Sequence, residues 1–273
     1  MATTFTRTFR VRSYELRVDG TVAHAVFLHW FQETAWEASA ARGFGPEEYA
    51  AMGAAWVMRG IDVEFLQPAF YGEQVAVTTW VSDFRRVRAH REYEARRRDD
   101  DALLARGRAD WVFLDLSTLT PRRLPREMLE RFVTNGRPAL VPLEWPGPSS
   151  GDLLGHFEAT RRVQQYELDQ MHHVNNAIYL NWIEQQANDA WLAWGRDPAM
   201  LRLRRHQIEY RHAAQSGDTF RLRSQAARVA ASLVWYHALL RDGTVLAEAR
   251  SLGAGEEVNG WGATDGVNGW NNG

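Results

Sequence analysis

The sequence predicts an α+β protein made of two similar halves, each with one long helix layered on several antiparallel strands. Residues 14–32 align without a gap on residues 166–184, and seven of the 19 positions are identical. The chain is therefore an internal duplication with an offset of 152 residues. In both copies a helical pattern follows the repeated segment, and a strand pattern follows the helix. This order predicts a helix-on-sheet layer in each half.

Each half is expected to contain one long amphipathic helix. In the second half the apolar positions at helical spacing are Leu180, Ile183, Ala187, Ala190, Trp191 and Trp194. In the first half the corresponding positions are Leu28, Phe31, Ala35 and Ala38. Segments 43–46 and 195–198 both begin with Gly and end with Pro, so they supply stop signals at matching places.

Downstream of each helix the period changes to two, which predicts strands. Residues 75–81 alternate in this way, and residues 111–114 form an apolar run covered on both faces. In the second half residues 220–223 and 233–237 show the same behaviour. Arg-Asp-Gly at 241–243 lies between two such runs and predicts a hairpin turn.

Pro, Gly and Ser gather between the two copies and mark a linker. We expect an N-terminal, non-catalytic half at 1–133, a linker at 134–157 and a C-terminal, catalytic half at 158–254. Residues 255–273 repeat Val-Asn-Gly-Trp in a Gly- and Asn-rich context, which is typical of a flexible tail.

Composition excludes several classes of function. The formal net charge is −2, so the molecule as a whole has no field that would recruit nucleic acid. Cysteine is absent, which removes disulfides, thiolate catalysis and Cys metal sites. No long apolar run or signal-peptide pattern is present, so we expect a soluble cytoplasmic protein that does not bind membranes.

The two copies differ in the polar residues that precede the helix. The second copy carries Asp169, His173, Asn175 and Asn176 where the first carries Arg17, Thr21, Ala23 and His24. The duplicated scaffold tolerates the first set, so starting the helix does not require the second set. This contrast favours a functional role for Asp169 and His173, whereas helix capping explains Asn175 and Asn176 equally well.

The arrangement suits the transfer of an acyl group to water. A helix N-terminus presents unpaired N–H groups and a partial positive charge, which polarise a carbonyl placed there. A carboxylate at Asp169 can attack that carbonyl or activate a water, while His173 and Asn175 hold the ligand. Glu184 is either a second catalytic carboxylate or, as we favour, a solvated helix residue. Asp169 and its neighbouring histidines lack a further ligand at metal-site spacing, so no metal or cofactor is expected.

A family resemblance rests on several motifs. The pattern Asp-x-x-x-His-Val-Asn-Asn-x-x-Tyr, from Asp169 to Tyr179, resembles the signature of hotdog-fold thioesterases. Segments 32–35, 56–59, 72–75 and 120–125 resemble the double-hotdog acyl-ACP thioesterases in the same order, and the likeness extends to about residue 253.

This resemblance implies a tandem double hotdog, in which a curved antiparallel sheet wraps a long central helix in each half. It also implies hydrolysis of fatty acyl thioesters, which releases free fatty acid from acyl carrier protein, in fatty acid biosynthesis. The expected catalytic residues, all in the second half, are Asp169, His173, Asn175 and Glu184. The expected oxyanion and substrate-positioning residues are Val174, Asn176 and Tyr179.

The chain also departs from the family pattern. Met171 stands where the family has Asn, and Ala213-Ala214 or Ala214-Gln215 falls where it has Glu-Cys. A simpler mechanism with one essential Asp is therefore expected. An acyl-CoA thioesterase of the single-Asp type and a non-catalytic acyl-binding protein remain open alternatives. Carrier-bound dehydration is disfavoured, because His173 is not followed by the Phe-Pro-Gly of those enzymes.

Arginines suggest how an acidic carrier would dock. Seven lie between residues 85 and 98, and Arg122 and Arg123 follow further on. They are expected to form an Arg-rich surface beside the acyl tunnel that steers acyl carrier protein, with a charge-balanced solvated face as the equal alternative. The sequence leaves open the length of the acyl chain and the oligomeric state, including a homodimer.

Overall fold

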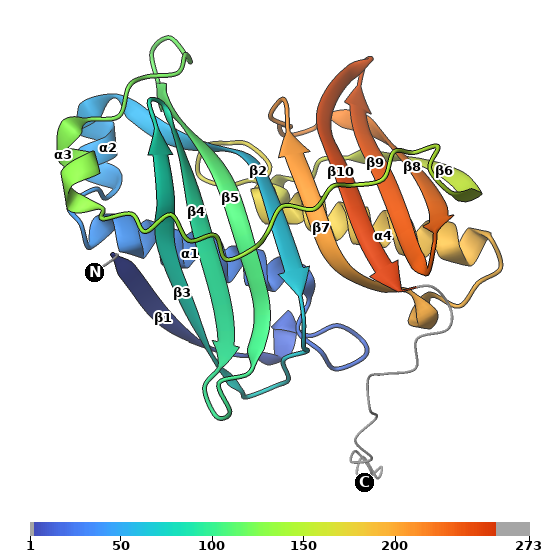
Figure 1. Ribbon diagram of the computed structural model, residues 1–273. Coiled ribbons are helices and arrows are strands. Elements are labelled where there is room, and N and C mark those ends of the chain that lie inside the picture. Colours follow the sequence, from blue (N-terminus) through green and yellow to red (C-terminus); the bar gives the residue numbers. More distant parts are fainter. Residues whose placement is uncertain (1–2, 255–273) are drawn as a thin grey trace, which may run out of the picture.

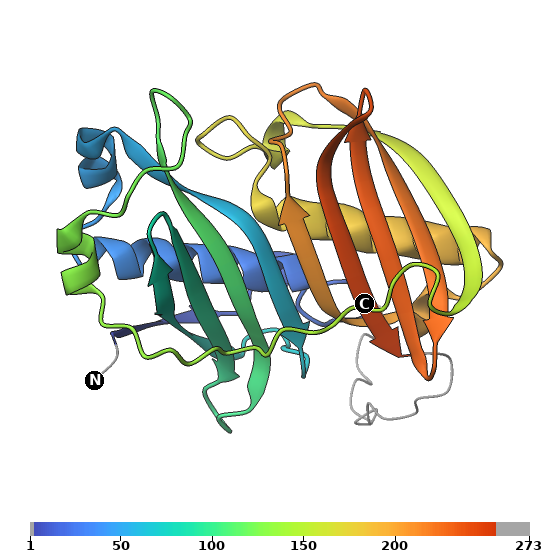
Figure 2. The same ribbon diagram turned by 45° about the horizontal axis from the view of Figure 1, so that its top comes forward.

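The structure is a computed structural model that describes residues 3–254 (Figure 1). Within this range ten strands form one antiparallel sheet in the order β1-β3-β4-β5-β2-β7-β10-β9-β8-β6. Two long helices, α1 (His24–Ala40) and α4 (Asn176–Ala193), contact each other, and Figures 1 and 2 show both on the same side of the sheet. The predicted α+β class, with one long helix and several antiparallel strands in each half, is confirmed.

The strands and the short helix before each long helix repeat in the same order in the two halves, whereas α3 has no counterpart in the second half. The first half contains β1 (Thr4–Arg10), η1 (Ser13–Glu15), α2 (Pro46–Met52), β2 (Ala54–Phe65), β3 (Gln74–Arg85), β4 (Arg88–Arg97), β5 (Leu103–Asp115) and α3 (Arg126–Arg131). The second half contains β6 (Asp152–Arg162), η2 (Gln165–Glu167), η3 (Pro198–Met200), β7 (Arg202–Tyr210), β8 (Thr219–Val229), β9 (Ser232–Arg241) and β10 (Thr244–Ala254).

The duplication is exact in the loop before each long helix. The N–H of Ala23 donates to the carbonyl of Glu15 at 2.9 Å, and the N–H of Asn175 donates to the carbonyl of Glu167 at the same distance. Both pairs are separated by the 152-residue offset read from the sequence. The two loops thus share one backbone framework, and their chemical differences lie in the side chains.

The halves join through the middle of the sheet and through a shared core. Strands β2 and β7 pair antiparallel, with Ile61 opposite Ile208, and one cluster of buried apolar residues spans both halves. Across this seam the guanidinium of Arg205 binds the carboxylate of Asp62 with distances of 2.6 and 2.9 Å. The bidentate ion pair and the continuous core make the two halves one packed body.

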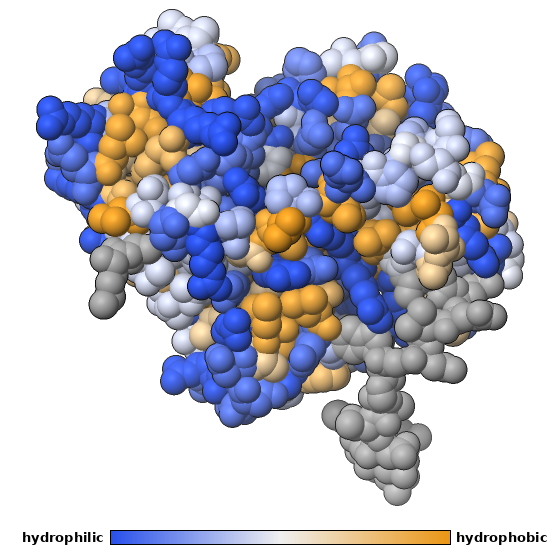
Figure 3. Space-filling model, viewed as in Figure 1, coloured by the Kyte–Doolittle hydropathy of each residue, from blue (hydrophilic) through white to orange (hydrophobic). Residues whose placement is uncertain are grey.

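The segment between the halves runs across the outer face of the sheet, as Figures 1 and 2 show. The N–H of Ala139 donates to the buried carboxylate of Glu92 at 2.9 Å, and the hydroxyl of Tyr236 donates to the carbonyl of Pro146 at 2.6 Å. Figure 3 shows this face as apolar patches separated by polar residues. Strand β6 begins inside the predicted linker 134–157. The connection is therefore a strap bonded to both halves.

The structure confirms the predicted hairpin turn and the predicted stop signals of the two long helices. The predicted hairpin turn has Asp242 at φ 49° and Gly243 at φ 82° between β9 and β10, which is the left-handed geometry of a two-residue turn. Gly43 and Gly195, which follow α1 and α4, have φ of 75° and 73°. The predicted tail at 255–273 lies outside the described residues. Among the helices described, none combines the length and the apolar character needed to cross a membrane.

Candidate active site

A cavity of about 550 Å³ occupies the first half and reaches the start of α4 in the second half. Its first-half wall is mainly apolar and includes Ala35, Phe44, Trp56, Val81, Phe84, Ala89, Met128 and Phe132. At the other end it is lined by Asp169, His173, Asn176, Tyr179 and Tyr210. One cavity therefore connects an apolar chamber to the predicted polar constellation.

Asp169 lies in the loop between η2 and α4 and is held by backbone hydrogen bonds. Its Oδ1 accepts from the N–H of Met171 at 2.9 Å and from the N–H of His173 at 3.4 Å. Its own N–H donates to the carbonyl of His173 at 2.8 Å. Its Oδ2 has no hydrogen-bond donor among the described residues. The loop thus orients the carboxylate through one oxygen and leaves the other available.

His173 and Val174 complete this edge of the cavity. His173 is half-buried, and its imidazole has no hydrogen-bond partner within the described part of the chain. Val174 is buried, and its N–H already donates to the carbonyl of Ala214 at 2.9 Å. Val174 therefore supplies an apolar wall and no free amide, whereas the imidazole of His173 is available to a ligand.

The two asparagines have different places. Asn175 is the N-cap of α4, since its Oδ1 accepts from the N–H of Ala177 at 2.9 Å. Its Nδ2 donates to Oε1 of Gln32 on α1 at 3.2 Å, and it does not line the cavity. Asn176 is the first residue of the helix and does line the cavity. Its N–H has no partner among the described residues, so this amide can polarise a carbonyl oxygen.

Two tyrosines close the polar end. Tyr179 is buried, and its hydroxyl oxygen accepts from the N–H of Ala214 at 3.3 Å. Burial raises the pKa of Tyr179 to about 12, so the phenol stays protonated at neutral pH. The hydroxyl of Tyr210, at the end of β7, donates to the carbonyl of Asn176 at 3.0 Å and holds the first turn of α4. Tyr210 was not singled out in the sequence, where the only signal is an aromatic residue at a strand end.

Glu184 does not line this cavity; it contacts the start of the other long helix. Its Oε1 lies 2.5 Å from Nδ1 of His24, the first residue of α1, and 3.4 Å from Nε2 of the fully buried His206. Burial by itself raises the pKa of Glu184, but the two histidines hold it well below its ordinary value. The structure thus brings Glu184 to the first-half helix start and away from Asp169.

The ligand atoms of His24, Glu184 and His206 lie within 4.8 Å of one another, a set that could hold a metal ion. The carboxylate already accepts a hydrogen bond from His24, and Nδ1 of His206 lies 2.8 Å from the hydroxyl of Ser251. Hydrogen bonds within the protein therefore account for much of this cluster.

The arginines of β4 mostly follow the alternative of a charge-balanced face. Most of their charges are paired with neighbouring acids, as in Arg88 with Asp110 and Arg97 with Asp100. The expectation is wrong for Arg91, which is only 9% exposed and lines the cavity. Alternation along β4 turns this residue toward the interior.

Arg122 and Arg123 follow β5. The guanidinium of Arg122 donates to the carbonyl of Met52 at 2.6 Å, and Arg123 is exposed. Leu116 and Leu119 in the same loop line the cavity. The two arginines therefore belong to a segment that borders the apolar chamber.

The positions where the chain departs from the family pattern also border the cavity. Met171 and Ala213 line it, and neither supplies a polar side chain. Asp169 is the only acidic residue that lines the cavity within the described range. Any carboxylate chemistry in this cavity therefore depends on Asp169.

Comparisons with known proteins agree with this architecture. The model of the acyl-ACP thioesterase N-terminal domain matches residues 2–132, and the model of the C-terminal domain matches residues 155–252. The palmitoyl-acyl carrier protein thioesterase of Gossypium hirsutum is 25% identical over 193 residues, which cover 67% of this chain and 47% of that protein. The oleoyl-acyl carrier protein thioesterase of Coriandrum sativum is 20% identical over 190 residues, with coverage of 64% and 51%. The chain thus spans about half the length of the curated relatives it matches.

Solved structures show the same fold. A putative oleoyl thioesterase from Lactobacillus plantarum aligns with a TM-score of 0.78 at 18% identity, covering 93% of this chain and 97% of that one. The 12:0-ACP thioesterase from Umbellularia californica aligns with a TM-score of 0.74 at 21% identity, covering 92% and 93%. These likenesses confirm the tandem double-hotdog fold. Because both domain models match in their proper order, the chain belongs to the acyl-ACP thioesterase family.

Proposed function

We propose that this protein hydrolyses acyl thioesters of acyl carrier protein and releases the free acid. The observation that carries the proposal is the position of Asp169, the only acid lining the cavity within the described range, where the apolar chamber meets the start of α4. The chamber suits an acyl chain, and the helix start suits the thioester carbonyl. Membership of the family supports the same substrate class.

In the proposed reaction the carbonyl oxygen accepts a hydrogen bond from the N–H of Asn176. The free carboxylate oxygen of Asp169 takes a proton from a water molecule as that water attacks the carbonyl carbon. The C–S bond then breaks, the acid forms, and the proton passes to the departing thiolate. The imidazole of His173 positions the water or the thioester.

The other predicted residues are proposed to shape the site or to hold its helices in place, without touching the reacting atoms. Val174 and Tyr179 shape the polar end, and Asn175 fixes the start of α4 through its cap. Glu184 supports the scaffold at the other helix start, because it does not line the cavity.

The direct test is a thiol-release assay with acyl carrier protein and coenzyme A thioesters of the same acyl groups. We expect release from both and a higher kcat/KM with the carrier protein. Release from neither thioester would contradict the proposal. Release from the coenzyme A thioester alone would make the protein an acyl-CoA thioesterase.

Arg122 and Arg123 are proposed to dock the carrier, since acyl carrier proteins are acidic and this loop borders the chamber. Added salt should lower kcat/KM on the carrier-bound substrate more than on the coenzyme A thioester, because encounter between charged proteins is screened. The double variant Arg122→Glu with Arg123→Glu should reproduce that selective loss. Equal salt sensitivity of the two substrates would remove the docking role.

A further inference from the structure

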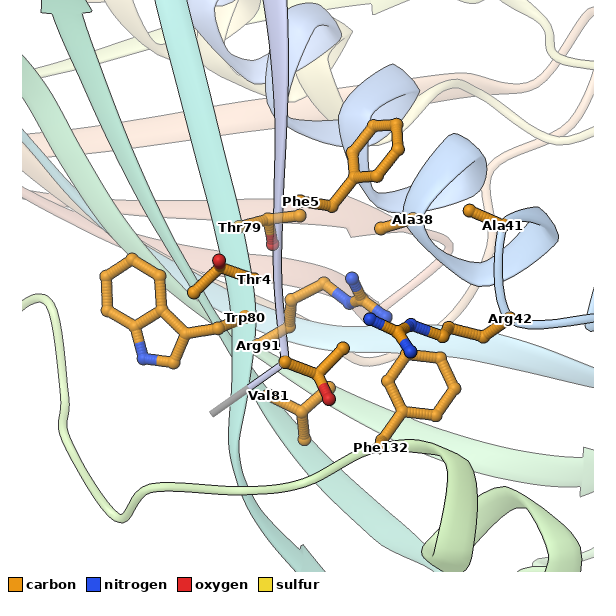
Figure 4. A pocket seen from close by; sticks show the side chains of 11 residues that line it. Thr4, Phe5, Ala38, Ala41, Arg42, Thr79, Trp80, Val81, Arg91 and Phe132 are labelled. Carbon is orange, nitrogen blue, oxygen red and sulfur yellow. The ribbon is translucent and has the colours of Figure 1, made fainter. Parts of the chain in front are cut away.

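The apolar chamber contains one buried cation. Arg91 in β4 is 9% exposed and lines both the main cavity and an adjoining pocket of about 100 Å³ (Figure 4). Figure 4 shows the Arg91 side chain ending beside the ring of Phe132, and its guanidinium carbon lies 5.8 Å from the centre of that ring. Both residues line both spaces, so the cation stands at the boundary between them.

Arg91 has no anionic partner in the described part of the chain. Its one hydrogen bond there runs from Nη2 to the hydroxyl of Ser39, and it is long at 3.3 Å. Arg205, which is equally buried, has a bidentate pair with Asp62. Burial lowers the pKa of Arg91, but an arginine keeps its proton at neutral pH. Buried charges in proteins are normally paired, so Arg91 is an exception that calls for a partner.

The protein surroundings stabilise the cation only in part. Arg91 lies near the C-terminal end of α1, whose partial negative charge favours a cation. The last carbonyls of this helix, however, already accept backbone hydrogen bonds at Glu37, Ser39 and Ala40. A second cation, the exposed Arg42, lines the adjoining pocket together with Phe132 (Figure 4). Two arginines thus line the adjoining pocket, and no carboxylate lines it among the described residues.

We propose that the acyl group bound in this cavity carries a carboxylate at its distal end, and that this carboxylate pairs with Arg91. The inference rests on the proposed hydrolase function and specifies its substrate class as monothioesters of α,ω-dicarboxylic acids. The wall between Asp169 and Arg91 is mainly apolar, so the chain that joins the two ends of the substrate is aliphatic. The guanidinium fork suits a carboxylate, whereas a methyl-ended chain leaves the buried cation unpaired.

The test compares two series of acyl carrier protein thioesters, from octanoyl to hexadecanoyl, that differ only in a terminal carboxylate or methyl group. At the best chain length we expect wild-type kcat/KM to favour the carboxylate by at least about tenfold, because a site built for a polar group rejects the analogue that lacks it. Arg91→Met should abolish or invert this ratio. Arg91→Lys should give an intermediate ratio, since it keeps the charge without the fork. Arg96→Met removes an arginine from the same strand outside the cavity and should leave the ratio unchanged.

Binding provides a readout that does not need hydrolysis. The dissociation constants of both series are measured with the Asp169→Asn variant, alone and combined with Arg91→Met or Arg91→Lys. Failure of the wild type to hydrolyse either series would end the hydrolase proposal, while an Arg91-dependent preference in binding would still support the distal carboxylate. Equal or better use of the methyl-ended chain at every length would overturn the inference. So would a preference for the carboxylate that is unchanged in Arg91→Met and Arg91→Lys.

Discussion

The starts of the two long helices share a backbone and differ in what fills the space beside them. At α4 the loop carries Asp169 and opens into the cavity. At α1 the equivalent place is filled by the hydrogen-bonded His24 and Glu184, and Phe65 stacks on His24 with a centroid distance of 3.8 Å. The duplication therefore kept the scaffold twice, with an open site in one copy and a filled site in the other.

The two helix starts differ in the side chains at positions that are equivalent by the repeat offset. Glu184 and His24 correspond by the repeat offset to Gln32 and Asn176, which lie at the other helix start. A carboxylate with an imidazole at one start is thus matched by two neutral amides at the other. The neutral pair adds no second carboxylate to the cavity that Asp169 lines. On the proposed function, one helix start serves the chemistry and the other holds the two halves together.

Apart from changes to Asp169 itself, the largest effect that separates the two helix starts is expected from removing His173. His173→Ala should lower kcat/KM by about 10- to 100-fold, because the imidazole positions the reacting groups. Thr21→Ala, at the equivalent place in the first half, should leave turnover unchanged. It removes a hydrogen bond to Asp19 of 2.7 Å and should cost about 1 kcal/mol of stability. Equal losses of turnover in the two variants at equal stability would contradict the claim that only the start of α4 takes part in turnover.

Glu184→Gln should act on stability and leave the chemical step nearly intact. The carboxylate interacts with His24 and the buried His206, so neutralising it should lower the free energy of unfolding by about 2 kcal/mol. Urea denaturation measures this loss, and Glu158→Gln on the surface provides the control. A large fall in kcat with unchanged stability would instead assign Glu184 to catalysis.

The polar interior of the second half should make the fold sensitive to acid. Burial lowers the pKa of His237 from 6.5 to about 3, and its Nδ1 lies 2.8 Å from the hydroxyl of Ser224. Between these two pH values His237 binds a proton in the unfolded chain and does not bind one in the folded chain. Stability should therefore fall as the pH drops below 6.5, by about 1.4 kcal/mol per pH unit for this proton.

The depressed pKa of Glu184 adds a loss of the same sign below its ordinary value of 4.5, where the unfolded carboxylate is protonated and the folded one is not. Denaturation at pH 7 and pH 5 tests the His237 contribution. His237→Gln should flatten this dependence, while the same change at the exposed His212 should not. An unchanged pH slope in His237→Gln would contradict the assignment.

The smallest effect concerns backbone geometry in the two loops. His172 has φ of 58°, and the equivalent first-half residue, Gly20, has φ of 79°. Left-handed backbone is strained for histidine and free for glycine, so His172→Gly should raise stability by up to about 1 kcal/mol without changing turnover. Thermal unfolding of the two proteins shows whether His172→Gly raises or lowers the stability. A loss of stability would show that the His172 side chain makes a contribution that the shared backbone does not explain.

Much of the fold could be predicted because its signals are local or repeated. The 152-residue offset, the helical spacing and the turn at 241–243 depend on neighbouring residues or on direct comparison of the two copies. The same comparison identified Asp169 and His173, which the structure brings to one cavity.

Two features of the site depend on packing between distant segments. Glu184 lies at a helical position that also suits solvent, and only the contact between α1 and α4 brings it to His24. Arg91 lies in a strand where polar residues fall on both faces, so periodicity does not show that its side chain points inward. The extent of the cavity and the burial of this cation follow from tertiary structure alone.

The most direct test of the contrast between the two helix starts compares turnover in Asp169→Asn and Arg17→Asn, which place the same side chain at equivalent positions of the two loops. Asp169→Asn keeps the shape of the side chain and removes the base, so kcat should fall by at least about 100-fold. Arg17→Asn should stay within about twofold of wild type, because no reacting group lies beside it. Urea midpoints and circular dichroism of both variants confirm equal folding. Near wild-type hydrolysis by a folded Asp169→Asn variant would contradict the account.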